Sequence, residues 1–260
     1  MIRILVFYGK DPSGIVEAYL QGRAPANFLY GFPLFERFGI QADIFVPAHG
    51  RISRAVMGLL RRVSRELGTL VSMWRLPFII RRYNALFLMN ADAVIGAVLL
   101  RALFAPRLKV FFYNDRAEKV AGRHWLKRRL FRKCDVIIAQ SLYHAKFTKA
   151  VFGKDSPVVY LGSDRDFFRP DGTATEDFVL SVGGDPGRDF ETLIAAVSRL
   201  PEIQFVFVGR ASKIQGLAVP SNVIVHYNVP PEELRKLYRR ARVVVIPLYQ
   251  DDHDYGFEMP

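Results

Sequence analysis

Short apolar runs alternate along the chain with longer stretches in which apolar residues recur every three or four positions. The short runs are typical of buried strands, and the longer stretches have the period of amphipathic helices. In the first part of the chain, strands are predicted at 2–8, 44–46, 85–89, 108–113, 136–139 and 158–161. Helices are predicted at 28–38, with an end at Gly39, and at 91–104, 119–133 and 142–152. Strands that alternate with helices form a parallel sheet covered on both faces, so we predict a doubly wound α/β fold.

A second series of strands and helices follows the polar turn PDGT at 170–173. Its strands are predicted at 178–182, 205–208, 223–225 and 243–246. The sequence VPPEELRKLYRRA before the last strand predicts a helix, with Pro231 and glutamates at its start and arginines at its end, as the helix dipole favours. We therefore expect two Rossmann-like domains, residues 1–170 and residues 171–260.

The most distinctive stretch is FVLSVGGDPGRDFETLIAAV, residues 178–197. A strand that ends in glycines and leads into a helix leaves bare backbone N–H groups near the positive end of the helix, where a phosphate or diphosphate binds well. Gly183 and Gly184 form this turn, and Arg188, expected in the first helical turn, adds a cation. The alternatives are an ordinary turn whose glycines permit positive φ, and a solvated Arg188 paired with Glu191 or Asp185.

The distribution of charged residues changes at the same boundary, near residue 170, that the strand and helix pattern predicts. Residues 1–170 contain 28 Lys and Arg against 12 Asp and Glu, whereas residues 171–260 contain 9 against 13, so net charges of +16 and −4 make up the total of +12. Such a step favours two domains with different partners. The single Cys134 excludes a disulfide within the chain, and the amino terminus is predicted as a strand rather than a signal peptide, so we expect a cytoplasmic protein.

The segment CDVIIAQSLYHAKFTKAVFGKDSPVVYLGSDRDFFRP resembles the domain junction of the GT-B glycosyltransferases, family 4 in particular, with Gly162, Asp164, Phe168 and Pro170 at matching positions. The stretch FVLSVGGDPGRDFETL is similar to the donor-diphosphate loop of that family. FVFVG and SNVIVHYNVPPEELRKLYRRARVVVIPL resemble the strand, loop, strand, helix and strand that follow it. The amino-terminal domain resembles the family in architecture alone.

This resemblance implies a retaining transfer of a sugar from a nucleotide-diphosphate donor to an acceptor hydroxyl, with protein cations in place of a metal or other cofactor. It places Gly183, Gly184 and Arg188 on the diphosphate, and Gly209 and Arg210 at the border of the nucleotide, although an ordinary surface turn fits the last two equally well. The remaining donor-binding candidate is Gly14, in a loop of the first domain.

Two carboxylates are the candidate catalytic residues. Asp115 follows a predicted strand and is placed near the reacting sugar, with a helix cap or an ion pair with Arg116 as alternatives. The chain departs from the family at Gly184, where an arginine is usual, and at Tyr255, where the first glutamate of the acidic signature is usual. Glu258 is the candidate to compensate. With four predicted strands the second domain keeps an unpaired edge, which favours a fragment of a longer enzyme.

The basic region Arg51–Arg82 interleaves arginines with large apolar residues. It fits an anionic membrane at the inner face of the cell, which would suit a lipid-linked or glycan acceptor. The alternative is that its apolar face packs on the sheet while the arginines are solvated. Nucleic acid is disfavoured, because the aromatic residues lie mostly in strand patterns. We therefore predict a glycosyltransferase of cell-surface polysaccharide synthesis; the alternatives are a nucleotide-sugar epimerase of the same fold and a non-catalytic basic module that binds membrane or nucleic acid.

Overall fold

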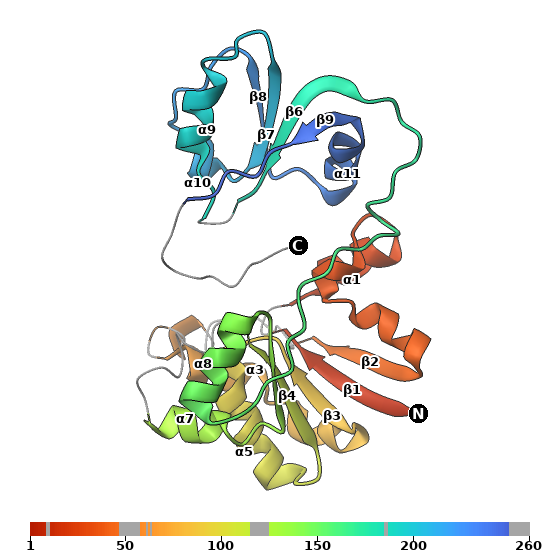
Figure 1. Ribbon diagram of the computed structural model, residues 1–260. Helices are drawn as coiled ribbons and strands as arrows, with labels where there is room; N and C mark the ends of the chain where they lie inside the picture. Colours follow the sequence, from red (N-terminus) through yellow and green to blue (C-terminus); the bar gives the residue numbers. More distant parts are fainter. Residues whose placement is uncertain are drawn as a thin grey trace. The chain divides into compact units, whose positions relative to one another are not determined.

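The computed structural model describes residues 1–8, 11–46, 58–60, 62, 64–114, 125–184 and 187–249 (Figure 1). Contacts divide these residues into two compact units. The first unit comprises 1–17 and 26–162, and the second comprises 18–25 and the residues from Ser163 onward. Each unit is described separately below.

The first unit contains a parallel five-stranded sheet with the order β2-β1-β3-β4-β5. Its strands are β1 (Ile2–Phe7), β2 (Ile40–Phe45), β3 (Ala85–Leu88), β4 (Lys109–Asn114) and β5 (Val136–Ala139). The chain leaves β1 toward one edge and returns to its other side as β3, so the order reverses between these two strands. In doubly wound sheets ligands bind at such a reversal, beyond the carboxyl ends of the strands.

Helices cover both faces of this sheet. They are η1 (Ala26–Leu29), η2 (Phe32–Phe38), α3 (Arg65–Ser72), α4 (Leu76–Ile79), η3 (Ile80–Arg82), η4 (Ala91–Ala93), α5 (Val94–Phe104), α7 (Trp125–Phe131) and α8 (Leu142–Phe152). Helix α1 (Ser13–Leu20) is divided between the two units after Glu17. The larger core contains the stacked rings of Phe131 and Phe152, with Phe112 edge-on to Phe131. The smaller core, on the opposite face, is built around Val6 and Phe32.

The second unit contains a parallel four-stranded sheet with the order β8-β7-β6-β9. Its strands are β6 (Glu176–Val182), β7 (Gln204–Gly209), β8 (Val223–Tyr227) and β9 (Ala241–Val244), and its helices are α9 (Phe190–Val197), α10 (Ala211–Ile214) and α11 (Pro231–Arg240). Phe190 and Phe207 meet in the core on the α9 side, and Leu180 packs with α11 on the other face. The prediction of an α/β fold with two parallel sheets is confirmed.

Edge strand β9 has no further neighbour among the described residues. Its side chains Val243 and Val244 are exposed, as expected for a sheet with an open edge. None of the described helices has the length and apolar character needed to cross a bilayer.

Several predicted elements have different bounds. The helix predicted at 28–38 is two 3-10 helices, because Tyr30 and Gly31 take left-handed backbone angles (φ 54° and 73°) and interrupt it. Its predicted end at Gly39 is confirmed, with φ 70°. The strand predicted at 158–161 was wrong, since Val158 forms one isolated bridge to Ala139.

The region Arg51–Arg82 is not one continuous helix where the structure describes it. Residues 51–57, 61 and 63 lie outside the described residues. The rest contains the separate helices α3, α4 and η3, with a break at Met73, whose backbone leaves the helical region, and a restart at Leu76-Pro77. The helix predicted at 119–133 is observed as α7, and residues 119–124 lie outside the described part.

Candidate functional site

A glycine turn lies at the reversal of strand order in the second unit. Strand β6 leads through α9 to β7 on one side, and β9 pairs with its other side, so the reversal lies between β6 and β9. Gly183 and Gly184 directly follow β6 at its carboxyl end. This is the position at which doubly wound sheets bind ligands.

Two arginines lie across these glycines. A Cβ atom added to Gly183 would stand 2.2 Å from Nε of Arg188, and one added to Gly184 would stand 2.8 Å from Cγ of Arg210. Each arginine stem therefore occupies the space that a side chain on the glycine would need. The structure brings together a bare main-chain turn and two guanidinium-bearing side chains from different loops.

Gly209 has a different reason to be glycine. Its added Cβ would stand 2.8 Å from the carbonyl oxygen of Gly183, so the ends of β6 and β7 touch through their main chains. The Gly183 N–H also donates to the Val208 carbonyl at 2.9 Å. Gly183, Gly184, Arg188, Gly209 and Arg210 thus form one cluster, which we name the glycine–arginine cradle.

Arg188 precedes helix α9 rather than lying in its first turn, so that part of the prediction was wrong. Asp189 is the N-cap, and its carboxylate accepts a hydrogen bond from the Thr192 N–H at 2.9 Å. Arg188 instead forms an antiparallel bridge with Leu248. Because Arg188 takes part in this bridge, helix α9 begins only at Phe190.

The segment that follows β9 borders the cradle, and sequence reasoning missed it. The Asp189 N–H donates to the Pro247 carbonyl at 3.2 Å, and the Tyr249 N–H donates to the Gly187 carbonyl at 3.0 Å. These two hydrogen bonds join Gly187 and Asp189 to a segment about sixty residues later in the chain. In the sequence, the apolar run RVVVIPL predicts a strand here. It does not show which segment of the chain that strand will lie beside.

The charge of Arg188 reaches helix α11. Burial raises the pKa of the Tyr238 hydroxyl, and the Arg188 cation opposes that effect.

The other predicted site residues are not part of this cluster. Gly14 belongs to the first unit and lies in the first turn of α1, where an added Cβ would meet no atom within 4 Å. Asp115 and Glu258 lie outside the described residues. Among the residues that the structure describes, no group of His, Cys, Asp and Glu could hold a metal ion.

Comparison with known proteins gave matches to solved structures only. No family model matches the chain, and no curated protein matches it. Sucrose-phosphate synthase from Thermosynechococcus elongatus superposes with a TM-score of 0.63 at 14% identity, over 96% of this chain and 76% of that one. The chain has the GT-B glycosyltransferase fold.

Two further GT-B structures agree with this assignment. HepE from Anabaena, in complex with UDP and glucose, superposes with a TM-score of 0.58 at 14% identity, over 95% of this chain and 74% of that one. A glycosyltransferase from Rickettsia africae ESF-5 gives a TM-score of 0.53 at 9% identity, over 94% and 72% of the two chains. At such low identity the likeness establishes the fold.

Proposed function

We propose that this GT-B chain is a glycosyltransferase that takes a sugar from a nucleotide-diphosphate donor and transfers it to a glycan or glycolipid acceptor. The observation that carries the proposal is the glycine–arginine cradle at the carboxyl end of β6. In this cluster, glycine backbone and two guanidinium groups lie together. They lie where the strand order of the sheet reverses, which is where doubly wound sheets bind ligands.

The cradle fits the chemical demand of sugar transfer. As the bond to the sugar breaks, negative charge grows on the departing diphosphate while positive charge develops on the sugar ring. Fixed cations near the diphosphate stabilise that charge without reorganisation, and guanidinium groups can bind phosphate oxygens in pairs. Arg188 and Arg210 are the side chains that would do this, and the glycines let backbone N–H groups approach the same oxygens.

The donor and the stereochemistry are finer parts of the proposal. HepE has been crystallised with UDP-glucose, which makes UDP-glucose the first donor to test on this chain. Retention of configuration follows from the resemblance to glycosyltransferase family 4. Gly14, Asp115 and Glu258 remain our candidates for the side of the site that faces the reacting sugar.

Calorimetric titration of the protein with UDP and UDP-glucose tests the donor site. Arg188→Met and Arg210→Met should each weaken binding by about tenfold or more, because each removes charge-assisted hydrogen bonds to phosphate. Arg199→Met is the matched control, since Arg199 follows the far end of α9 and should leave the affinity unchanged. If no nucleotide diphosphate binds, or if all three variants bind equally well, the donor-site proposal is wrong.

A product assay separates transfer from the alternatives. Incubation with the donor and a glycan acceptor should give a glycoside whose anomeric configuration, read by NMR, is that of the donor. Conversion of the nucleotide sugar to an epimer without transfer would support the epimerase of the same fold. Steeply salt-dependent binding of DNA that ignores Arg188→Met would support a non-catalytic basic module.

A membrane surface is the partner that we propose for the first unit. Met73, Leu76 and Ile80 are fully buried, so this region packs on the sheet, yet Trp74 and Phe78 are 53% and 76% exposed. Their rings are in contact, with centroids 6.5 Å apart. The alternative that the apolar face packs on the sheet therefore holds for Met73, Leu76 and Ile80, whereas exposed Trp74 and Phe78 support the proposed membrane contact.

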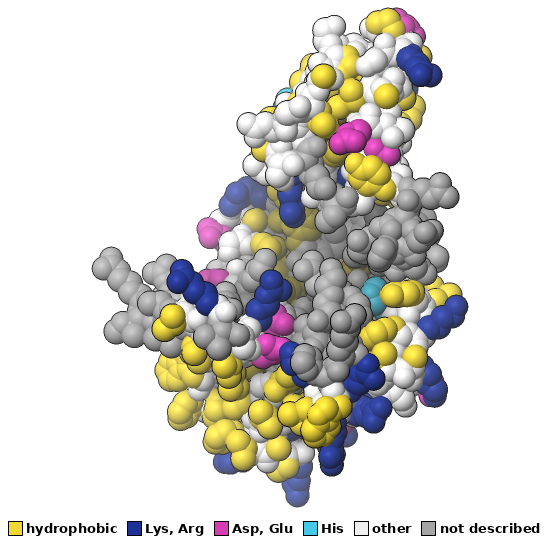
Figure 2. All heavy atoms as spheres, turned by 90° about the vertical axis from the view of Figure 1, so that its left-hand side faces the viewer, with side chains coloured by type: hydrophobic (Ala, Val, Ile, Leu, Met, Phe, Trp, Pro, Cys, Tyr) yellow, Lys and Arg dark blue, Asp and Glu magenta, His cyan; other side chains and the backbone are white. Residues whose placement is uncertain are grey.

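The exposed apolar surface continues onto α5 and carries cations. Arg81 donates to the Phe104 carbonyl at 2.8 Å, which joins η3 to the end of α5, where Leu103 is 73% exposed. Arg75 and Arg82 flank the same patch in the sequence. In the view of Figure 2, hydrophobic side chains of the first unit gather among Lys and Arg. Exposed aromatic residues beside arginines favour an anionic leaflet, and we place the protein at the cytoplasmic face of the membrane.

Vesicle sedimentation tests this partner. The double variant Trp74→Ala, Phe78→Ala should reduce binding to phosphatidylserine-containing vesicles several-fold, and added salt should weaken the binding of the parent protein. Phe38→Ala is the control, because Phe38 is also exposed but lies in η2. Equal binding by the double variant and the control would exclude this patch as the contact.

A further inference from the structure

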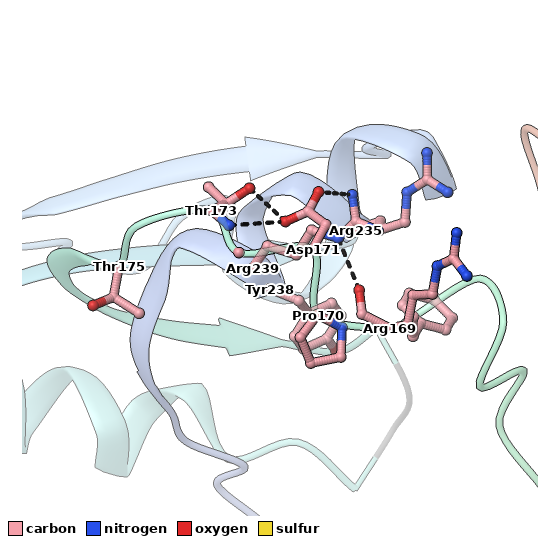
Figure 3. A pocket seen from close by; sticks show the side chains of 10 residues that line it. Arg169, Pro170, Asp171, Thr173, Thr175, Arg235, Tyr238 and Arg239 are labelled. Atoms are coloured by element: carbon pink, nitrogen blue, oxygen red, sulfur yellow. Dashed lines mark hydrogen bonds and ion pairs between the residues drawn. The ribbon is translucent and has the colours of Figure 1, made fainter.

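A pocket lies in the second unit, between the segment that precedes β6 and helix α11. It has a volume of about 330 Å³. Figure 3 shows this α11 pocket from close by. Its lining consists of Phe168, Arg169, Pro170, Asp171, Gly172, Thr173, Thr175, Arg235, Tyr238 and Arg239. None of the five cradle residues is among them.

An ion pair and hydrogen bonds between lining residues fix one side of the pocket. Arg239 forms an ion pair with Asp171 at 2.5 Å and donates to the Arg169 carbonyl at 3.0 Å. Asp171 also accepts hydrogen bonds from the Thr173 hydroxyl and N–H. These two hydrogen bonds, followed by the Arg239 cation, lower the pKa of Asp171. Arg239 and Asp171 therefore satisfy each other and fix the backbone that carries Arg169.

Arg169 and Arg235 differ from the other cations of this region. On α11, Lys236 pairs with Glu233 and Arg240 pairs with Glu176, and on β9 Arg242 pairs with Asp177. Within the described part of the chain, neither Arg169 nor Arg235 has a carboxylate at ion-pair distance. In Figure 3 their guanidinium groups extend to the same side of the pocket, away from Asp171.

The position of Arg235 is set by an aromatic ring rather than by an acid. Its guanidinium carbon stands 4.4 Å from the centroid of the Phe167 ring. Its Nε is buried and makes no hydrogen bond within the described structure. The ring of Phe167, and not a hydrogen bond at Nε, therefore holds this guanidinium group.

The chemistry of the lining selects the class of ligand. Three arginines and one aspartate leave a positive balance, in a domain whose residues 171–260 have a net charge of −4. Two uncommitted guanidinium groups bind the oxygens of a phosphate better than those of a single carboxylate, since together they offer more donors than a carboxylate accepts. Tyr238 and Phe168, with ring centroids 5.9 Å apart, add an aromatic wall for an organic group.

We propose that the α11 pocket binds the phosphate group of a small phosphorylated molecule. Arg169 and Arg235 contact the phosphate, and Tyr238 packs against the remainder of the ligand. The lining of this pocket contains none of the five cradle residues, and the proposal does not depend on the proposed sugar transfer.

Calorimetric titration of the whole protein with inorganic phosphate, at constant ionic strength, tests the site. The titration is repeated with saturating UDP, so that phosphate bound in the cradle is displaced and phosphate in the α11 pocket remains. Arg169→Met and Arg235→Met should each weaken the remaining binding by about tenfold or more, and Arg235→Lys should weaken it less. Acetate at the same concentration should not compete.

Matched variants decide between the outcomes. Lys236→Met removes the same charge from α11 outside the pocket, and Arg188→Met removes a charge from the cradle; both should retain phosphate binding in the presence of UDP. Loss in Lys236→Met as large as in Arg235→Met would show a general charge effect and overturn the proposal. So would the absence of phosphate binding, equal competition by acetate, or a loss confined to Arg188→Met. Arg169 is exposed, so Arg169→Met remains informative if Arg235→Met fails to fold.

Discussion

The two units share a parallel, doubly wound sheet, but they place their bulky side chains differently. Of the largest fully buried side chains among the described residues, Phe207 alone belongs to the second unit. The first unit holds the others, including Phe7, Phe112, Phe131 and Phe152. The second unit instead brings main chain against main chain at Gly183 and Gly209, and arginine stems lie over Gly183 and Gly184. Side-chain packing organises the first unit, and close backbone approach organises the proposed site of the second.

This difference shows how one fold can serve two purposes. A thick aromatic core gives the first unit a rigid body whose outer helices can present Trp74 and Phe78 to a partner. The strand ends of the second unit instead place the stems of Arg188 and Arg210 beside the bare main chain of Gly183 and Gly184.

Phe112→Ala should destabilise the first unit by about 3–5 kcal/mol, because it removes a fully buried ring that packs against Phe131. Both tryptophans, Trp74 and Trp125, lie in this unit, so urea unfolding followed by their fluorescence reports on it. Phe78→Ala is the control and should change the free energy of unfolding by less than about 0.5 kcal/mol. Similar effects from the two variants would contradict the assignment of the core.

Gly209→Ala and Gly14→Ala compare predicted donor-binding glycines of the two units. Gly209→Ala should destabilise the second unit by about 1–3 kcal/mol, because the new methyl group meets the Gly183 carbonyl, and should weaken UDP binding. Gly14→Ala has open space and should change stability by less than about 1 kcal/mol. Thermal melting followed by circular dichroism, with UDP titration, measures both effects.

A loss of transferase activity in Gly14→Ala without a loss of stability would support its approach to the donor. Full activity in that variant would remove Gly14 from the site. Unchanged stability in Gly209→Ala would show that the ends of β6 and β7 are not in contact.

The caps of two matched helices give a smaller contrast. Ser141 caps α8 of the first unit and accepts from the His144 N–H at 3.3 Å, and Asp189 caps α9 of the second. Asp189→Ala should cost about 1 kcal/mol, and Ser141→Ala about 1–2 kcal/mol, because Ser141 and His144 are buried. Denaturant unfolding of each variant, with Asp189→Asn as the conservative control, checks the order; a larger cost for Asp189→Ala would reverse it.

The smallest effect concerns acid stability of the first unit. Burial alone would raise the pKa of Glu66, but hydrogen bonds from Lys127 and Ser64 outweigh it and lower the pKa from 4.5 to about 2. Because the folded-state pKa is lowered, this stabilisation is present above pH 4.5 and is lost as the pH falls toward 2. A partly exposed pair of this kind contributes less than about 1 kcal/mol.

Glu66→Gln should therefore lower the free energy of unfolding at pH 6, and its difference from the parent protein should shrink at pH 3.5. Asp155→Asn, which removes an exposed ion pair with Lys149, should show little difference at either pH. A Glu66→Gln difference that grows on acidification would have the wrong sign and would exclude the ion pair as its source.

Local pattern predicted most elements of this fold. The alternation of strands and helices predicted the two parallel sheets that are observed. Gly39 was correctly predicted to end a helix, and its backbone is left-handed there. The prediction failed where one residue redirects the chain, as at Tyr30, whose positive φ divides a helix that its apolar period favours. It also failed at 158–161, because an apolar run becomes a strand only where a neighbour can pair along its length.

The sequence by itself determined that glycines end a buried strand before a helix, which made a phosphate-binding turn one interpretation beside an ordinary strand-to-helix turn. Only the tertiary structure decided that β9 lies beside β6, that the side chains of Arg188 and Arg210 lie over Gly183 and Gly184, and that Arg235 stacks on Phe167 beside the α11 pocket. The physical reason is the distance along the chain over which each kind of interaction acts. Periodicity and turn chemistry act over a few neighbouring residues, whereas strand order and side-chain neighbours depend on the packing of segments that are far apart in the chain.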